Sequence, residues 1–377
     1  MERQRRATSS SRDMQALGTR GGETPTQEPD LGRRRFLGAA VLAMTDPRAA
    51  RIGGADAGAP HELASLPQAT EWINSPHLTA ATLVGKIILA DFWTYTCINW
   101  LRTLPHVRAW ARKYSGRLAV IGVHTPEFAF ERNPQNVRRS VQQMKIDYPV
   151  AMDNDHSIWS AFSNNGWPDL YLIDARGQLR YHHFGEGEYQ QSERAIQGLL
   201  AEAGLAKPGE GLVSVEGAGV EAAADLDSSR STETYLGHDR TAGFASPGGA
   251  VPDRPRAYVA PRRLALNEWA LAGDWTMGSQ AVGLSGDRGR ISYRFHARDV
   301  HLVIGPSRPG AAVPFRVSLD GRPPGAAHGV DVHSDGTGTI VEQRLYQLIR
   351  QSRPIVDRTF EIEFAHAGVD AFAFTFG

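Results

Sequence analysis

The chain is organised around the stretch Ala90-Asp-Phe-Trp-Thr-Tyr-Thr-Cys-Ile-Asn-Trp100, which holds the only cysteine in 377 residues. Before it, residues 86–92 form a short apolar and partly β-branched run, which predicts a buried strand. After it, apolar residues recur at spacings of three from Leu101 to Trp110, which predicts a helix that begins at about Cys97. A cysteine at such a junction lies at the positive end of the helix dipole. We therefore expect a lowered thiol pKa and a nucleophilic Cys97.

These residues resemble the active-site segment of the thioredoxin family. Asp91, the aromatic pair Phe92-Trp93 and Pro105 match that family's Asp-Phe-Trp and helix-kinking proline around its Cys-x-x-Cys motif. Where the family has its second cysteine, this chain has Trp100. In dithiol members the first cysteine attacks a disulfide and the second resolves the mixed disulfide. The resemblance therefore implies that Cys97 can begin this reaction but cannot finish it alone.

Composition bounds the class of protein. The 41 Lys and Arg residues balance 41 Asp and Glu residues, so no nucleic-acid partner is indicated. Hydrophobic residues make up 41%, enough for sizeable cores, and a single cysteine rules out a disulfide within the chain. No cluster of His, Cys or Asp has the spacing of metal ligands, so we expect neither a metal nor another cofactor.

Residues 1–57 predict a disordered n-region followed by a twin-arginine signal peptide. Gly32-Arg-Arg-Arg-Phe-Leu-Gly38 fits the twin-arginine pattern, and Ala55-Asp-Ala57 offers a cleavage site. The apolar segment from Phe36 to Met44 is too short to span a bilayer of about 30 Å. We therefore expect export to an extracytoplasmic location, the periplasm or cell envelope.

Residues 60–204 alternate between strand and helix patterns, which predicts an α/β domain. The resemblance implies a thioredoxin-like fold, and the insertion before the Trp-Pro step resembles the TlpA-like branch. Beyond the first strand and helix, the patterns predict strands at 118–123, 148–152, 166–174 and 178–184, and helices at 136–144, 157–162 and 193–203.

The resemblance also implies a substrate site. The family places a cis-proline against its cysteine, where the flanking backbone pairs with the substrate, and Trp167-Pro168 matches that step. Open α/β sheets hold ligands at the carboxyl ends of their strands, where Thr94-Tyr-Thr96 and His124-Thr-Pro-Glu127 are expected. We expect a surface cleft in which the substrate-binding residues around Cys97 are Thr94, Tyr95, Trp100, Trp167 and Pro168.

Asp91 is the second candidate catalytic residue beside Cys97. It lies in an apolar strand, where an unpaired carboxylate is costly, so we expect a raised pKa. The resemblance implies that this acid passes protons during disulfide exchange. The alternative is a structural aspartate held by a hydrogen bond, and the sequence leaves both open.

Residues 205–232 lack periodicity and predict a linker. In residues 233–377, period-two apolar runs separated by Gly, Pro and Asp turns predict an all-β sandwich, with one helical interruption near 341–350. Trp269 and Trp275 are candidate sugar platforms, although core positions are the more common role of tryptophan.

The order of signal, redoxin and sandwich resembles the extracytoplasmic half of DipZ-type proteins. Ile121-Gly-Val-His-Thr-Pro-Glu127, Phe184-Gly-Glu-Gly187, Glu233-Thr-Tyr-Leu-Gly237 and Phe374-Thr-Phe-Gly377 carry this resemblance. It implies a jelly-roll sandwich like a carbohydrate-binding module, with a glycan as a further candidate ligand. We do not expect the membrane-embedded electron-transfer domain of that group in this sequence. Because Trp100 stands where the second cysteine would be, we expect an external thiol reductant to complete the cycle.

Three functions follow. The first is an exported monothiol oxidoreductase that acts on protein or low-molecular-weight disulfides in cell redox homeostasis. The second is a one-cysteine peroxidase, since Thr94-x-x-Cys97 matches part of the peroxiredoxin motif, although Ala90 stands where that motif has proline. The third is a redox-inert binding protein, which a bulky Trp100 close to the sulfur would favour.

Overall fold

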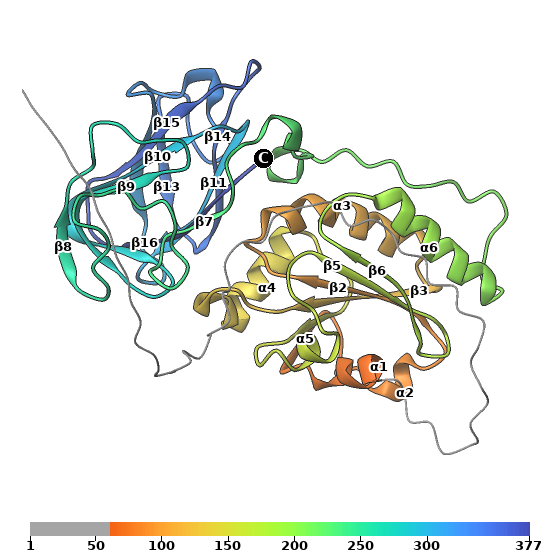
Figure 1. The fold of residues 1–377 in the computed structure, drawn as a ribbon. Helices are drawn as coiled ribbons and strands as arrows, with labels where there is room; N and C mark the ends of the chain where they lie inside the picture. The colour runs from red at the N-terminus through yellow and green to blue at the C-terminus, as the bar shows by residue number, and fades with distance from the viewer. Residues whose placement is uncertain (1–60) are drawn as a thin grey trace, which may run out of the picture. The chain divides into compact units, whose positions relative to one another are not determined.

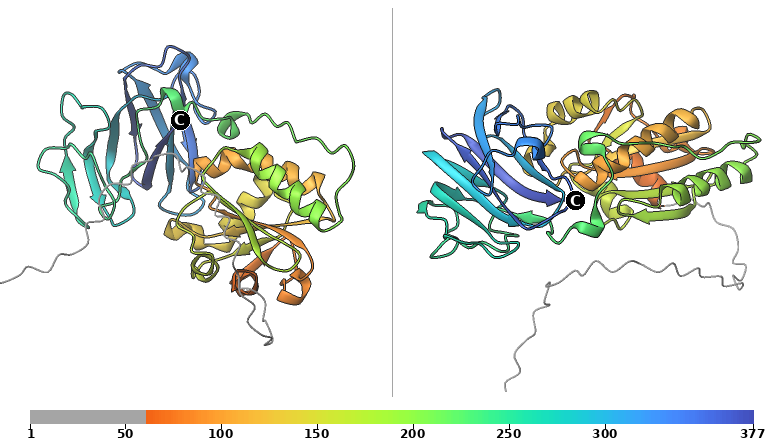
Figure 2. Two further views of the ribbon diagram at one scale, coloured as in Figure 1. Left: turned by 45° about the vertical axis from the view of Figure 1, so that its right-hand side comes forward. Right: turned by 90° about the horizontal axis from the view of Figure 1, so that it is seen from above.

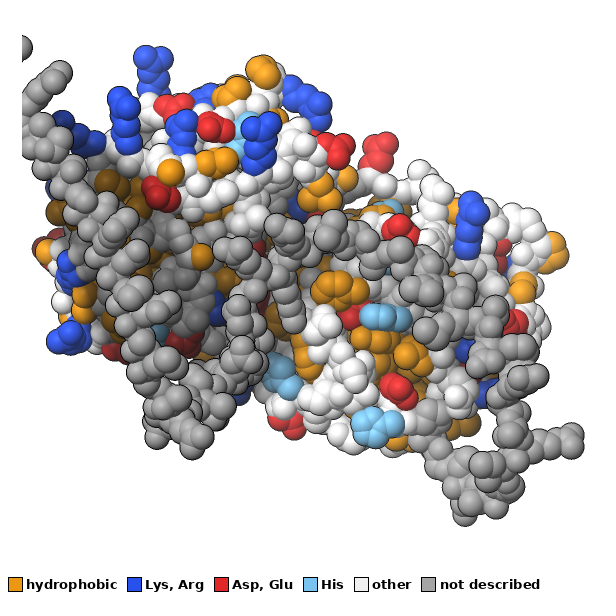
Figure 3. Space-filling model, in the orientation of Figure 1, with side chains coloured by type: hydrophobic (Ala, Val, Ile, Leu, Met, Phe, Trp, Pro, Cys, Tyr) orange, Lys and Arg blue, Asp and Glu red, His pale blue; other side chains and the backbone are white. Residues whose placement is uncertain are grey.

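The structure, a computed structural model, describes residues 61–377. The predicted n-region and signal peptide lie outside these residues. Within residues 61–377, no helix combines the length and the apolar character needed to cross a membrane. Acidic and basic side chains are interspersed over the described part of the face shown in Figure 3, in keeping with the balanced composition.

The first domain is built on one mixed six-stranded sheet in the order β1-β4-β3-β2-β5-β6 (Figure 1). The strands are β1 (Glu71–Ile73), β2 (Ile87–Trp93), β3 (Leu118–His124), β4 (Val150–Met152), β5 (Asp169–Ile173) and β6 (Leu179–Phe184). Strand β3 runs parallel to both β2 and β4, and the remaining pairs are antiparallel. This is the predicted thioredoxin-like α/β sheet.

Helices cover both faces of this sheet (Figure 2). They are α1 (His61–Ser65), α2 (Ala80–Leu83), α3 (Ile98–Lys113), α4 (Pro134–Gln143), α5 (Ser157–Ala161) and α6 (Tyr189–Glu202). Side chains of β2 alternate between two cores: Leu89 and Trp93 pack with α3, α4 and α6, whereas Ile88 and Phe92 pack with α1, α2 and α5. Burial on both faces explains the continuous apolar run that predicted this strand.

The remaining predicted strands and helices of this domain are present within a few residues of their expected bounds. Besides short 3₁₀ turns, two α-helices and one strand were not predicted, namely α1, α2 and β1. They contain 5, 4 and 3 residues, which is too few for either apolar period to show.

The second domain is all-β, as predicted, and its named strands pair antiparallel. They are β7 (Thr234–Tyr235), β8 (Pro255–Tyr258), β9 (Trp269–Met277), β10 (Val282–Phe295), β11 (Asp299–Pro306), β12 (Val313–Leu319), β13 (Thr337–Ile340), β14 (Arg344–Arg350), β15 (Arg358–Phe364) and β16 (Val369–Phe376).

These ten strands form one sheet curled into a half-barrel, where we predicted two separate sheets of a sandwich. Strand β10 explains the difference. It is 14 residues long, pairs with β9, β15 and β16, and carries a register shift between Leu284 and Gly289. A long strand that changes partners at a bulge links what would otherwise be two sheets.

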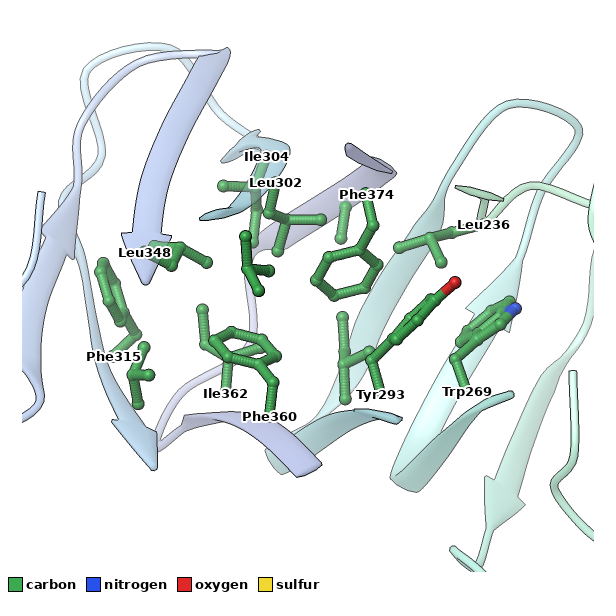
Figure 4. Close-up of a cluster of buried hydrophobic side chains, with 14 of the residues drawn as sticks. Leu236, Trp269, Tyr293, Leu302, Ile304, Phe315, Leu348, Phe360, Ile362 and Phe374 are labelled. Carbon is green, nitrogen blue, oxygen red and sulfur yellow. The ribbon is translucent and has the colours of Figure 1, made fainter. Parts of the chain in front are cut away.

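The concave side of this sheet encloses a single apolar core (Figure 4). Tyr293, Leu302 and Phe374 point into it from β10, β11 and β16. Trp269 and Trp275 are both 0% exposed in the same core. Neither indole offers a free face to a sugar, so the core interpretation of these tryptophans is confirmed.

The predicted helical interruption near 341–350 is wrong, because residues 344–350 form β14 and residues 342–343 are a bend before it. Five consecutive residues of this strand are buried, so it lacks the alternation of a half-exposed strand. Tyr346 and Leu348 pack in the core of the second domain, whereas Leu345 packs in a cluster with residues of the first. A strand buried on both faces cannot be told from a buried helix by periodicity alone.

The segment 205–232 contains two short 3₁₀ turns, η3 (Gly219–Glu221) and η4 (Leu226–Ser228). Part of it lies along α3, where Arg108 pairs with Glu221 at 2.6 Å. Residues 205–209 are exposed. The division into separately folding domains at this linker stays a prediction.

Candidate functional site

Cys97 lies at the strand-to-helix junction that the sequence predicts. Strand β2 ends at Trp93, and Cys97 is the residue that caps the N-terminus of α3, with its own backbone extended. The Cys97 N–H donates to the Thr94 carbonyl at 3.2 Å, and the Leu101 N–H donates to the Cys97 carbonyl at 3.0 Å. The turn therefore fixes the thiol at the start of the helix.

The thiol meets the Trp167-Pro168 step, as predicted. The Cys97 Sγ lies 3.7 Å from the Trp167 carbonyl oxygen, to which the S–H donates. The Trp167-Pro168 peptide bond is cis, which confirms the prediction made from the resemblance. The Trp167 indole is partly exposed and packs against Trp159 at 4.8 Å between ring centroids. Two segments 70 residues apart thus form one site.

The predicted lowering of the thiol pKa is not found. Cys97 keeps some exposed surface, yet burial by the surrounding protein raises its pKa, and the negative charges of Glu233 and Glu127 raise it further. Backbone hydrogen bonds from Trp100 and Asn99 at the helix N-terminus act in the opposite direction and do not compensate. Desolvation of a thiolate outweighs the small favourable effect of one helix end.

Trp100, which replaces the second cysteine, is a core residue. Its indole is 0% exposed and stacks on Trp93 with 4.3 Å between ring centroids. Its Nε1–H donates to both carboxylate oxygens of Asp91, at 3.2 and 3.1 Å. The indole therefore satisfies the buried acid, and Cys97 remains partly exposed beside it.

Asp91 has the raised pKa that its place in an apolar strand predicts. Burial is the main cause and raises the pKa to about 7, against the lowering effect of the Trp100 hydrogen bond. The charge of Asp169 contributes a further increase. A carboxyl group with this pKa changes its protonation state near neutral pH.

The other predicted substrate-binding residues are buried. Thr94, Tyr95 and Pro168 have almost no exposed surface, and the Tyr95 ring stacks on His124 with 5.7 Å between centroids. Trp167 is the one member of the predicted set that is partly exposed. The assignment of the set to substrate binding stays a prediction. The buried members have almost no surface with which to contact a substrate.

A second group of polar residues adjoins the thiol. Glu127, after β3, accepts a hydrogen bond from the Tyr235 hydroxyl at 2.5 Å and contacts the Arg240 guanidinium at 3.2 Å. With Trp167, these residues line a cavity of about 370 Å³. The sequence does not predict the contact between Glu127 and Tyr235. The two residues are 108 positions apart, so no local pattern could connect them.

Fold and site together define a thioredoxin-like redoxin in which tryptophan replaces the second active-site cysteine. Residues 231–377 match the family described as "Thioredoxin like C-terminal domain". Protein DipZ of Mycobacterium tuberculosis (strain CDC 1551 / Oshkosh) is 35% identical over 314 residues, which cover 82% of this chain. The chain spans 42% of the length of that relative.

Two further relatives match the first domain. Thiol-disulfide oxidoreductase YkuV of Bacillus subtilis (strain 168) is 30% identical over 132 residues, covering 35% of this chain and 88% of that protein. A solved thioredoxin-like protein in the oxidized form is 30% identical, with coverage of 35% and 90% and a TM-score of 0.33. The chain belongs to the thioredoxin-like redoxins of the TlpA/DipZ type, with the C-terminal domain that its second half matches.

Proposed function

We propose that this protein is an exported thiol-disulfide oxidoreductase that works through the single thiol of Cys97. The observation that carries the proposal is the position of the sulfur. Cys97 is a partly exposed residue at the N-terminus of α3, and its sulfur lies 3.7 Å from the carbonyl of the cis-proline step. A backbone edge beside a nucleophilic sulfur is suited to holding a disulfide-bearing peptide. The relative YkuV is named as a thiol-disulfide oxidoreductase.

The exchange needs no cofactor. The Cys97 thiol loses its proton, and the thiolate attacks one sulfur of the substrate disulfide. A bond forms between the two sulfur atoms while the substrate bond breaks, and the departing sulfur takes the bonding pair and then a proton. Because the structure places an indole where a resolving thiol would lie, an external thiol must attack the mixed disulfide and regenerate Cys97.

Asp91 and Trp100 are assigned supporting roles in this scheme. The indole N–H occupies both oxygens of Asp91, which supports the structural alternative for this acid over direct proton transfer to Cys97. Its pKa of about 7 would still allow it to exchange a proton at neutral pH. We also propose that the protein is exported by the twin-arginine route. The domains at 60–204 and 233–377 are proposed to fold separately.

Alkylation of the folded protein across a range of pH tests the proposal. Iodoacetamide should modify the wild-type protein at one site, and Cys97→Ser should remain unmodified. Because burial and nearby carboxylates raise the pKa of the thiol, the rate should keep rising above pH 9. A thiol that reacts only after a denaturant is added would contradict an enzymatic role.

The alternative is a redox-inert binding protein. The observation that favours it is the raised pKa of Cys97, because a protonated thiol is a poor nucleophile at neutral pH. The same alkylation experiment separates the two functions. A glycan ligand has no support from Trp269 and Trp275, which are buried.

A further inference from the structure

Two carboxylates beside the redox site share one phenol. The Tyr235 hydroxyl lies 2.5 Å from Glu127 Oε1 and 3.0 Å from Glu233 Oε2. A phenol has one proton to donate, so it satisfies one of these carboxylates at a time. Burial and the charge of Glu127 raise the pKa of Glu233 to about 7, so above this pH Glu233 is ionised and needs a positive partner from elsewhere.

Arg240 is the cation of this group and balances only one of the two charges. Its guanidinium nitrogens lie 3.2 and 3.3 Å from Glu127 Oε1, and its central carbon lies 3.5 Å from the centre of the Tyr235 ring. No ion pair to Glu233 is found among residues 61–377. Above pH 7, where Glu233 is ionised, the group therefore carries an excess negative charge.

Part of this acidic group lines a cavity that the thiol adjoins through Trp167. Glu233 does not line this cavity itself and lies behind Tyr235, whose hydroxyl is 3.0 Å away. Glu127, Tyr235 and Arg240 line the cavity of about 370 Å³ together with Trp167, whose carbonyl accepts from the thiol. Asp239 and His156 also line it, and Asp239 pairs with His238 at 3.0 Å. Glu127 and Glu233 both act on Cys97 through their charge. The charges of the acidic group therefore act both on the thiol and on a molecule bound in the cavity.

We propose that this cavity is a substrate site that selects disulfides carrying a positive charge close to the sulfur atoms, with Glu127 and Glu233 as the selecting residues. The inference rests on the proposed function and names the substrate class for it. A cationic group on the substrate would balance the excess negative charge of the acidic group, whereas an anionic group would be repelled by it. The C-terminal domain, which supplies Glu233, Tyr235 and Arg240, then contributes to specificity.

The exchange itself is unchanged by this selection. The Cys97 thiolate forms a bond to one sulfur of the disulfide, the original sulfur–sulfur bond breaks, and the released thiolate takes a proton from water. A charge three or four bonds from the attacked sulfur would reach into the cavity that Glu127 lines. Because the interaction is partly screened by solvent, each carboxylate should change the rate about 3- to 10-fold.

The test uses three symmetrical disulfides of similar size: cystamine, which is cationic, bis(2-hydroxyethyl) disulfide, which is neutral, and 3,3′-dithiodipropionate, which is anionic. The rate at which full-length protein gains one adduct is measured by intact mass for each, above pH 7, where Glu233 is ionised. These reagents differ in intrinsic reactivity, so the quantity compared is the cation-to-anion rate ratio in wild type against the same ratio in each variant. The differences between reagents then cancel.

Glu233→Gln and Glu127→Gln should each lower this ratio about 3- to 10-fold. Glu233 is exposed, so its substitution leaves the fold intact even if removing the more enclosed Glu127 does not. Glu202→Gln is the matched control, because Glu202 is an exposed carboxylate on α6 that pairs with Arg180. Its ratio should equal that of wild type.

An unchanged ratio in both Glu127→Gln and Glu233→Gln would overturn the inference, as would a wild-type preference for the anionic reagent after correction for intrinsic reactivity. The neutral disulfide separates this failure from that of the proposed function. If wild type forms the neutral adduct without charge selection, only the inference falls. If wild type forms no adduct with any reagent, the proposed function falls with it.

Discussion

The indole Nε1 of Trp100 lies 3.2 and 3.1 Å from the two carboxylate oxygens of Asp91. This contact connects the two unusual features of the site, a buried acid and the absence of a second cysteine. An unpartnered buried carboxyl group is costly, and the indole supplies its donor. Trp100 therefore has a structural role at the position where dithiol relatives carry a reactive group.

Trp100→Phe should destabilise the protein by about 2–4 kcal/mol, because it removes the donor to Asp91 and leaves a small cavity. Trp110→Phe is the matched control. Trp110 is also fully buried in α3, but its Nε1 has no hydrogen-bond partner within residues 61–377. Urea unfolding of both variants measures the difference.

The same pair can be tested by a double-mutant cycle. Combined with Asp91→Asn, Trp100→Phe should cost less than it does alone, since a neutral amide loses less than a carboxylate when its donor is removed. Equal costs for Trp100→Phe and Trp110→Phe, together with additivity in the cycle, would show that the hydrogen bond contributes nothing.

Asp91→Asn should change how stability depends on pH. The pKa of Asp91 is raised to about 7 in the folded state, above its ordinary value, so the folded protein holds a proton that the unfolded chain loses at about pH 4. Stability from this group is therefore present below pH 4 and is lost as pH rises through 7. Relative to Asp91→Asn, wild type should lose about 2–4 kcal/mol between these values.

Chemical denaturation of wild type and Asp91→Asn at several pH values gives this difference directly. Other raised carboxyl groups, such as Glu131, titrate in both proteins and cancel in the comparison. A constant difference between pH 4 and pH 8 would mean that Asp91 is already ionised throughout this range in the folded protein.

Much of the redox site was predictable because a local pattern carries it. The apolar run before Cys97 and the helical spacing after it each involve residues close together in sequence, whereas the cis-proline at Trp167-Pro168 was expected from the family resemblance alone. Alternation along β10, β11, β12, β15 and β16 likewise predicted an all-β second domain. The strand and helix patterns follow from residues that neighbour one another in the chain.

The features that were not predicted depend on packing between distant segments. The contact between Glu127 and Tyr235 exists only once the two stretches are folded together. The direction of the Cys97 pKa change depends on what covers the thiol, and the helix terminus alone suggested the opposite direction. The sequence of β14 does not predict a strand, because burial on both faces removes the alternation of apolar and polar residues.

Limited proteolysis tests the predicted linker. Cleavage should occur first within residues 205–209, which are exposed and follow the end of α6. The later part of the segment should be protected by the pair between Arg108 and Glu221, so Arg108→Gln should allow a second cut near residue 221. Fragments are identified by mass. Resistance of the whole segment 205–232 would contradict a linker between separately folding domains.

The central claim is that Cys97 attacks a disulfide and that the reaction then stops for want of a second thiol. The direct test is the intact mass of wild type, Cys97→Ser and Trp100→Cys after incubation with bis(2-hydroxyethyl) disulfide. Removing the indole costs stability, so the measurement is made where circular dichroism shows that Trp100→Cys is folded.

We predict that wild type retains one adduct until a low-molecular-weight thiol is added, and that Cys97→Ser gains none. Trp100→Cys should release its adduct and lose two hydrogen atoms as an internal disulfide forms. If wild type gains no adduct while Trp100→Cys reacts, the thiol is shielded by Trp100 and the monothiol mechanism is wrong.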